Sequence, residues 1–189
     1  SFQGLYPQET EDIQDTLLRV KRPNVLVVFM ESFGSKFVKE LGGLPDVAPG
    51  MSRLIPQSIL WEHVYSNSFR TDRGTVSTFS GWVSYPTASL IRLPEKLGNI
   101  PSLARSLSRE GYHTCYLYGG DITFMNTQGY LVSTGYRQLV SDSDFSLAQI
   151  NESKWGANDS VTARRTFEMI ASGEMPEPWH MTFQTLSSH

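Results

Sequence analysis

The sequence contains a single cysteine, Cys115, among 189 residues. One cysteine excludes a framework of internal disulfides and a zinc site built from several cysteines. The residue lies among aromatic side chains in the run HTCYLYGGD, so we expect a small buried hydrophobe rather than a reactive thiol. The chemistry of this chain must therefore come from other side chains.

Excess positive charge and long apolar runs are also absent. Lys and Arg number 16 against 19 Asp and Glu, the net charge is −3 and the pI is about 5.8. Without a basic stripe, the chain lacks the phosphate-neutralising surface that nucleic-acid binding requires. No apolar run approaches the ~20 residues that cross a bilayer. The composition that remains, 39% hydrophobic, is typical of one globular domain with a sizeable core.

Apolar runs bounded by polar segments predict a mainly parallel sheet. The run NVLVVFM, residues 24–30, is continuous and β-branched, as expected of a strand buried on both faces. Further strands are expected at residues 58–67, 113–121 and 179–187. Helices are expected at residues 12–20, 50–58, 75–82, 102–110, 123–133 and 160–171, the last with Asp159 or Ser160 as N-cap, and a loop at residues 93–101. This alternation indicates a three-layer α/β fold with helices on both faces of the sheet.

Polar clusters follow each of the four expected strands. They are Glu31-Ser32, residues 70–73 (Arg-Thr-Asp-Arg), residues 119–121 (Gly-Gly-Asp) and residues 187–189 (Ser-Ser-His). The carboxyl ends of parallel strands share one edge of a sheet, so we expect these clusters to converge there.

Thr71 is the candidate nucleophile of these clusters. A threonine hydroxyl needs a general base or a metal to become reactive, and the strand–turn motif of Ser-His-Asp hydrolases is missing. Glu31 and Thr71 could instead offer hard oxygen ligands to Mn²⁺ or Mg²⁺, while Arg70 or Arg73 neutralises a phosphoryl or sulfuryl group. The alternatives are structural: a solvated turn at residues 70–73, and Glu31 as the cap of a following helix.

Five segments occur in one order along the chain: RPNVLVVFMESFG, SFRTDRGTVSTFSG, GYHTCYLYGGDITFMN, WGANDS and FQTLSSH. Together they resemble the sulfatase-like catalytic domain of lipoteichoic acid synthases and related phosphoglycerol transferases, in the alkaline phosphatase superfamily. The resemblance runs from about Arg22 to His189.

The resemblance implies roles for individual residues. It makes Glu31 a ligand of a divalent metal, most of all Mn²⁺ with Mg²⁺ or Zn²⁺ as alternatives. It makes Thr71 both the nucleophile and a second ligand, and it places His189 in the substrate pocket. Asp121 is a further candidate for the substrate pocket, with a structural role in its turn as the alternative.

Three departures from the family pattern matter. The family grips the glycerol phosphate head group with a Trp-Asn-Arg sequence, where this chain reads Phe124-Met125-Asn126-Thr127, so only Asn126 remains as a candidate and the head group is open. The residues beside Thr71 also differ from those usual in Gram-positive synthases. The family's downstream Asp-His metal ligands would fall beyond His189, so we expect full metal affinity to need them.

The resemblance also implies domain organisation and reaction. Residues 1–22 are expected to be a linker or helical segment after a membrane region, and residues 23–189 the N-terminal part of the catalytic domain, outside the cytoplasm. Double displacement would move a phospho-head group from a lipid phosphodiester donor, through phosphothreonine, to a glycan or lipid acceptor. The alternatives are a phosphodiesterase, a sulfatase, or an inactive module that binds a glycan or a lipid head group. Residues 71–74 lack the Cys/Ser-x-Pro-x-Arg pattern that sulfatases modify to formylglycine.

Overall fold

A computed structural model describes residues 18–151 and 153–188, and its centre is a four-stranded sheet. The strands are β1 (Val25–Phe29), β2 (His113–Tyr118), β3 (Gln138–Val140) and β4 (Trp179–Gln184). All neighbours run parallel, in the order β1-β4-β2-β3. The predicted parallel α/β fold is confirmed.

The helices are short, apart from two that border the site and the sheet. They are α1 (Pro49–Leu54), α2 (Thr71–Ser80), α3 (Pro94–Leu97), α4 (Leu103–Arg109), α5 (Thr127–Ser133), α6 (Leu147–Ile150) and α7 (Asp159–Ala171). Single 3₁₀ turns are η2 (Ser35–Phe37), η3 (Lys39–Leu41), η4 (Ile55–Gln57), η5 (Leu90–Arg92), η6 (Phe124–Asn126) and η7 (Asp142–Asp144). Among the described helices, none is long and apolar enough to cross a membrane.

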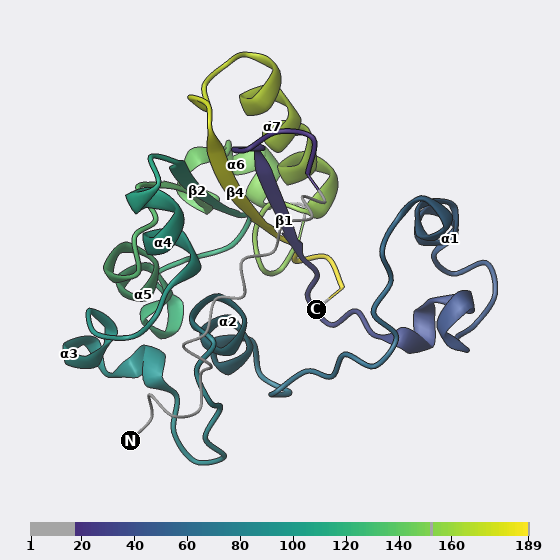
Figure 1. Ribbon diagram of the computed structural model, residues 1–189, viewed down its shortest axis with the longest axis horizontal. Coiled ribbons are helices and arrows are strands. Elements are labelled where there is room, and N and C mark those ends of the chain that lie inside the picture. Colours follow the sequence, from purple (N-terminus) through teal and green to yellow (C-terminus); the bar gives the residue numbers. More distant parts are fainter. Residues whose placement is uncertain (1–17, 152, 189) are drawn as a thin grey trace.

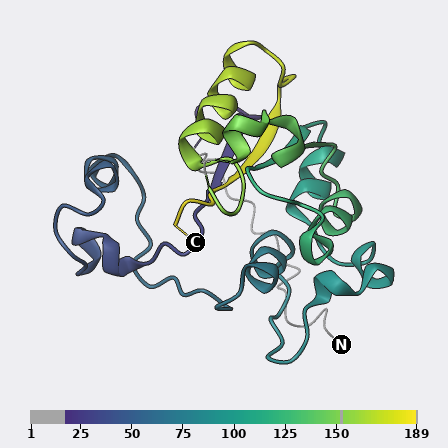
Figure 2. The same ribbon diagram turned by 180° about the vertical axis from the view of Figure 1, so that it is seen from behind.

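Helices cover the sheet on both faces, which gives the three layers (Figures 1 and 2). On one face, Phe29 and Tyr116 pack with residues of α2, α4 and α5 in one core cluster. On the other face, Leu117 of β2 and Met181 of β4 pack with Met169 of α7 in a second cluster. Because strand side chains alternate, β2 contributes Tyr116 to the first cluster and Leu117 to the second, so the sheet separates two cores.

Strand β1 lies at the edge of the sheet and is only half buried, which corrects the expectation of burial on both faces. Val27 and Phe29 pack against the α2 side, whereas Leu26 and Val28 are 39% and 49% exposed. The physical reason is the placement of α7, whose cluster includes residues of β2 and β4 but none of β1. A continuous apolar run is typical of a buried strand, but it does not specify its neighbours.

The strand expected at residues 58–67 is wrong. This segment has no strand partner and belongs to an arm, residues 32–70, that carries η2, η3 and α1 and extends away from the sheet (Figures 1 and 2). Apolar side chains of this segment, among them Trp61 and Tyr65, are 71% and 84% exposed. A pleated segment is stable only when its backbone pairs with another strand, and the sequence pattern does not reveal that partner.

The other elements that the sequence predicted are present with shifts at their ends, whereas strand β3 and helix α6 were not predicted. The helix expected at residues 75–82 begins earlier, at Thr71, and the loop at residues 93–101 contains the short helix α3. The N-cap of α7 is Asn158, whose Oδ1 accepts hydrogen bonds from the backbone of Ser160 and Val161. The helix expected at residues 12–20 falls mostly outside the described residues, and residues 18–20 are not helical. Cys115 is fully buried as expected, and burial raises its pKa to about 12.

Candidate active site at the carboxyl ends of the strands

Glu31 lies just beyond the carboxyl end of β1, where two backbone contacts fix it to β4. The Glu31 backbone N–H donates to the Thr185 hydroxyl at 2.8 Å, and the Thr185 N–H donates to the Phe29 carbonyl at 3.0 Å. These bonds continue the pairing of β1 and β4 past the end of the ladder. The backbone that carries the Glu31 side chain is therefore held against the residue that follows β4.

Thr71 is the first residue of α2, and its side chain meets Glu31. The Thr71 hydroxyl donates to Glu31 Oε2 at 2.9 Å, while Ser32 Oγ donates to Oε1 at 3.2 Å. Ser32 has φ 52°, in the left-handed region that non-glycine residues rarely adopt. Glu31 thus contacts two hydroxyl groups and caps no helix, since η2 begins only at Ser35. The expected convergence of these two clusters is confirmed.

The position of Thr71 suits a group that becomes negatively charged. The first backbone N–H groups of a helix have no intrahelical partner, and the helix dipole places partial positive charge at that end. The preceding Arg70 is extended and its carbonyl accepts the Gly74 N–H at 2.8 Å, which closes the first turn of α2. An oxyanion formed at Thr71, or an anion bound beside it, would therefore be stabilised by α2.

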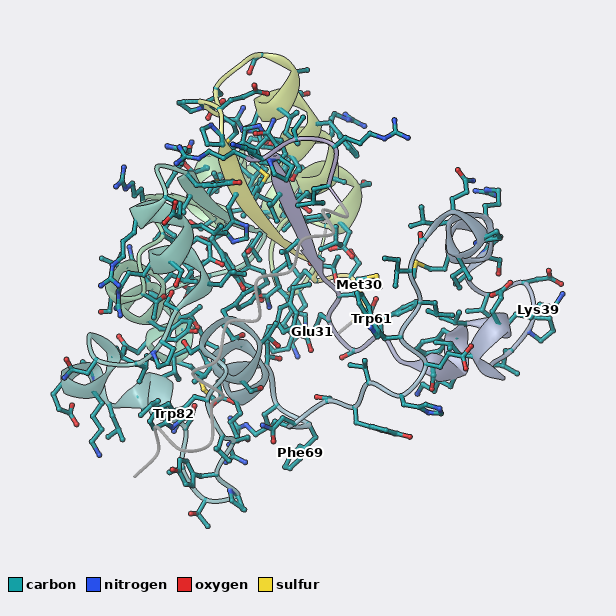
Figure 3. The ribbon with its side chains drawn as sticks, viewed as in Figure 1. Met30, Glu31, Lys39, Trp61, Phe69 and Trp82 are labelled. Carbon is teal, nitrogen blue, oxygen red and sulfur yellow. The ribbon has the colours of Figure 1, made fainter. Side chains whose placement is uncertain are left out.

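A cleft of about 770 Å³ opens at this site. Glu31 and Thr71 both line it, and Figure 3 shows Glu31 between the end of β1 and α2. The rest of the lining comes from the arm, from α2 and from the segment after α2, and it is mixed: aromatic side chains such as Tyr65 and Phe69 lie there together with polar ones such as Asn67. The cleft therefore combines the pair of Glu31 and Thr71 with a wall that carries both polar and aromatic side chains.

Glu31 and Thr71 suit two positions of a metal site. A carboxylate and a hydroxyl oxygen in hydrogen-bond contact are hard ligands of the kind that Mg²⁺ and Mn²⁺ prefer. Within the described residues, no group of three or more His, Cys, Asp or Glu side chains forms a metal cluster. The residues present thus fit part of a divalent-cation site.

The arginines beside Thr71 point to different places. Arg70 lines the cleft, and its Nε lies 3.3 Å from Oδ1 of the largely buried Asp72. Arg73 is not among the cleft-lining residues, and its guanidinium lies 6.0 Å from the centre of the Phe69 ring. Two residues along a helix turn the side chain by about 200°, which explains why Arg73 leaves the cleft that Thr71 enters. The structure brings Arg70, but not Arg73, to the site.

Asp121 and Asn126 both stabilise the segment after β2. Asp121 Oδ1 accepts from the Thr123 N–H at 2.7 Å and from its hydroxyl at 2.6 Å. These hydrogen bonds hold the pKa of Asp121 below its ordinary value. The Asn126 amide donates to the Ile91 carbonyl at 2.7 Å. Neither residue lines the cleft, their roles in substrate binding remain predictions, and His189 falls outside the described residues.

Sequence reasoning missed three features of the site. Thr185, which positions Glu31, lies within the FQTLSSH segment, but the sequence pattern gave it no role of its own. Asp159 accepts hydrogen bonds from the backbone of Leu186 and Ser187 at 2.6 and 3.1 Å, and so fixes the segment that leaves β4. Arg92 contacts the segment after β2, and nothing in its local sequence points to that contact.

The family model named Sulfatase matches residues 23–189. The chain belongs to the sulfatase family. A curated relative, the lipoteichoic acid synthase-like YvgJ of Bacillus subtilis, is 24% identical to this sulfatase-family chain over 173 residues, which are 89% of the chain and 27% of YvgJ.

Two solved structures share the fold. An alkaline phosphatase superfamily protein from Vibrio parahaemolyticus has a TM-score of 0.79 and 27% identity, with 91% of this chain and 42% of that protein covered. The lipoteichoic acid synthase LtaP from Listeria monocytogenes has a TM-score of 0.74 and 17% identity, with 89% and 41% covered. The resemblance predicted from the sequence is thus confirmed at the level of family and superfamily. The chain spans less than half the length of each of these relatives.

Proposed function

We propose that this chain carries the nucleophile of a metal-dependent phosphotransferase that moves phosphoglycerol, or a related phospho-head group, from a lipid donor. The observation that carries the proposal is the 2.9 Å hydrogen bond from the Thr71 hydroxyl to Glu31, at a helix N-terminus in the wall of a cleft. Membership of the sulfatase family and the similarity to a synthase-like relative support it.

The reaction would proceed by double displacement. Thr71 Oγ1 attacks the phosphorus of the donor, an O–P bond forms, and the bond from phosphorus to the diacylglycerol oxygen breaks. Diacylglycerol leaves as the alcohol after taking up a proton, and Thr71 is left as a phosphodiester of the head group. The hydroxyl of a glycan or lipid acceptor then attacks the same phosphorus and releases Thr71.

The residues of the chain divide the work. Glu31 accepts the hydrogen bond of Thr71 and so holds Oγ1 in one orientation. The N-terminus of α2 stabilises negative charge that develops at Thr71 and on the phosphoryl oxygens. Arg70 lines the cleft next to Thr71 and can neutralise part of the remaining charge.

A divalent cation, most of all Mn²⁺ with Mg²⁺ or Zn²⁺ as alternatives, would be held by Glu31 and Thr71 together with ligands that these two residues do not supply. When bound, such a cation lowers the pKa of a coordinated hydroxyl and offsets phosphoryl charge.

The proposal includes a place and partners for the protein. The lipid donor and the glycan or lipid acceptor belong to the cell envelope, so we place the catalytic domain on the extracytoplasmic side of the cell membrane. The aromatic side chains in the mixed lining of the cleft are consistent with a donor that carries apolar groups near its phosphate.

The test is intact-protein mass spectrometry of the full-length protein incubated with Mn²⁺ and phosphatidylglycerol or phosphatidylethanolamine. We expect a covalent adduct whose mass names the head group, and we expect it to vanish in Thr71→Ala. The matched control is Thr78→Ala, which removes a hydroxyl from the same helix and the same cleft.

Other outcomes separate the alternative functions. Release of diacylglycerol together with the free phosphorylated head group, without transfer to an acceptor, would identify a phosphodiesterase that uses the same residues. The absence of both adduct and diacylglycerol, together with binding of the lipid, would favour an inactive head-group-binding module and would contradict the transferase.

A further inference from the structure

Two arginines from separate segments meet at one methionine beside the cleft. Arg92 Nη2 lies 2.8 Å from the sulfur of Met125, and Arg70 Nη2 lies 3.8 Å from the same sulfur. The two guanidinium groups are therefore separated by no more than the sum of these distances. That spacing lets both groups donate to a single tetrahedral anion.

The positive charge of this pair is poorly compensated. The sulfur of a thioether is a weak, neutral acceptor and cancels no charge. Asp72 lies beside the Nε edge of Arg70, which leaves the Nη groups facing Met125. None of the ion pairs among the described residues includes Arg92. Two like charges that share an uncharged contact repel each other, and a bound anion would relieve that repulsion.

The backbone that carries Arg92 is fixed in place. The neighbouring Ile91 is fully buried, and its carbonyl accepts the Asn126 amide at 2.7 Å. Met125 and Asn126 both adopt left-handed φ values, 59° and 66°. A Cβ on Gly129 would lie only 2.3 Å from Asn126 Oδ1, so the Asn126 side chain is closely packed. The loop that carries Met125 and the turn that carries Arg92 are thereby joined.

We propose that Arg70 and Arg92 together bind the phosphate group of the donor next to the Thr71 hydroxyl. The proposal rests on the proposed function for the identity of the donor. Arg70 directly precedes Thr71 and lines the cleft. Arg92 is not among the cleft-lining residues and reaches the site only where it meets Arg70 at the methionine that both contact. Arg92 takes the place that the sequence pattern assigned to Arg73, and Asn126 acts as a positioning residue for it.

The test uses isothermal titration of the full-length protein in the Thr71→Ala background, in chelator-containing buffer. One arm titrates inorganic phosphate, and the other titrates the soluble short-chain lipid dihexanoyl phosphatidylglycerol. Arg92→Gln should weaken the binding of both about tenfold, the size expected for loss of one charge-assisted hydrogen-bond donor. Arg92→Lys, which keeps the charge but loses the bidentate fork, should weaken both about threefold.

Two further variants are controls, one for the loss of a positive charge elsewhere on the protein and one for the loss of the Met125 sulfur. Arg109→Gln removes the same charge from the last turn of α4 and should leave both affinities within twofold. Met125→Leu removes the sulfur but keeps both guanidinium groups, so it should also leave them within threefold. Thermal unfolding of each variant checks that the fold is intact.

The proposal is overturned if Arg92→Gln behaves like Arg109→Gln toward phosphate. It is also overturned if phosphate binding weakens while the lipid binds unchanged, because the pair would then hold an anion other than the donor. Both readouts use protein that cannot form an adduct. Failure of the phosphothreonine mechanism therefore leaves the phosphate arm interpretable, and failure of the arginine pair leaves the mechanism untouched.

Discussion

The Thr71 hydroxyl donates to the Glu31 carboxylate at 2.9 Å across a separation of 40 positions in the chain. Glu31 lies at the end of an edge strand and Thr71 at the start of a helix, so this contact joins the N-terminus of α2 to the edge of the sheet. Its energetic value is modest because both residues are partly exposed. Its importance lies in orienting the hydroxyl toward the cleft.

Replacing Glu31 with Gln should abolish most of the proposed activity. Glutamine keeps an oxygen that can accept from Thr71 but removes the negative charge that a divalent cation requires. We expect the rate of diacylglycerol release to fall by about 100-fold or more, as when one group that contacts transition-state charge is removed. The Mn²⁺ concentration for half-maximal activity should rise. Glu62→Gln on the exposed arm is the control, and equal rates in both variants would exclude Glu31 from the site.

The hydrogen bond between Ser80 and Tyr130 should couple α2 to α5. The two hydroxyls are 2.8 Å apart and both residues are buried. Tyr130→Phe should lower the free energy of unfolding by about 1–3 kcal/mol, because it leaves the Ser80 hydroxyl buried without a partner. In a double-mutant cycle with Ser80→Ala, urea unfolding should show a combined loss smaller than the sum of the single losses. If the losses in free energy of unfolding were strictly additive, the hydrogen bond between Ser80 and Tyr130 would not stabilise the packing of α2 against α5.

Gly119 should not tolerate a side chain. A Cβ at this position would lie 2.2 Å from the Ala157 carbonyl oxygen, and the same backbone approach includes a 2.9 Å hydrogen bond from the Ala157 N–H to the Gly119 carbonyl. Gly119→Ala should lower the free energy of unfolding by about 1–3 kcal/mol through overpacking. Gly98→Ala is the matched control, since it has open space and φ −64°. A melting temperature unchanged by Gly119→Ala would show that the loop can move away.

Acidification should destabilise the fold through His180. This residue is fully buried on β4 beside the Tyr136 hydroxyl, 3.3 Å from Nε2, and burial lowers its pKa. The unfolded chain takes up a proton near pH 6.5 while the folded chain does not, so the free energy of unfolding falls as the pH drops below about 6.5. The slope for one such group is at most about 1.4 kcal/mol per pH unit.

The pH dependence is measured by chemical unfolding between pH 5 and pH 8. His180→Gln should flatten the decline below pH 6.5, because glutamine does not titrate there. His63→Gln, at an exposed position, should leave the slope of the wild-type protein unchanged. An identical slope in His180→Gln and wild-type protein would assign the acid sensitivity to other groups.

Local sequence patterns were sufficient to locate an element that is a continuous apolar run or that carries its own end signals. Strand β1 was predicted within one residue at each end, because a short, continuous run of β-branched residues is typical of a strand in a parallel sheet. Helix α4 was located by its apolar spacing and its closing Gly111, which has φ 87°. The contact of Glu31 with Thr71 was predicted from the rule that parallel strands end at one edge. That reason was wrong for Thr71, which follows no strand and is brought to Glu31 by the packing of α2.

Other features depend on contacts that no local pattern specifies. Residues 58–67 have the apolar content expected of a strand, but their backbone pairs with no other strand. Arg73 is as basic as Arg70, yet the rotation of α2 turns it away from the cleft. Arg92 lies 33 positions from Met125, and only the packing of Ile91 and the hydrogen bond from Asn126 bring the two together.

The sequence by itself determined the fold class, the family and the two residues at the centre of the candidate site. It could do so because apolar periodicity and motif order are properties of neighbouring residues. The tertiary structure alone decided which charges surround that centre and which strand lies at the edge. Those outcomes depend on side chains far apart in the chain, and their positions follow only when burial and backbone hydrogen bonding are satisfied throughout the molecule.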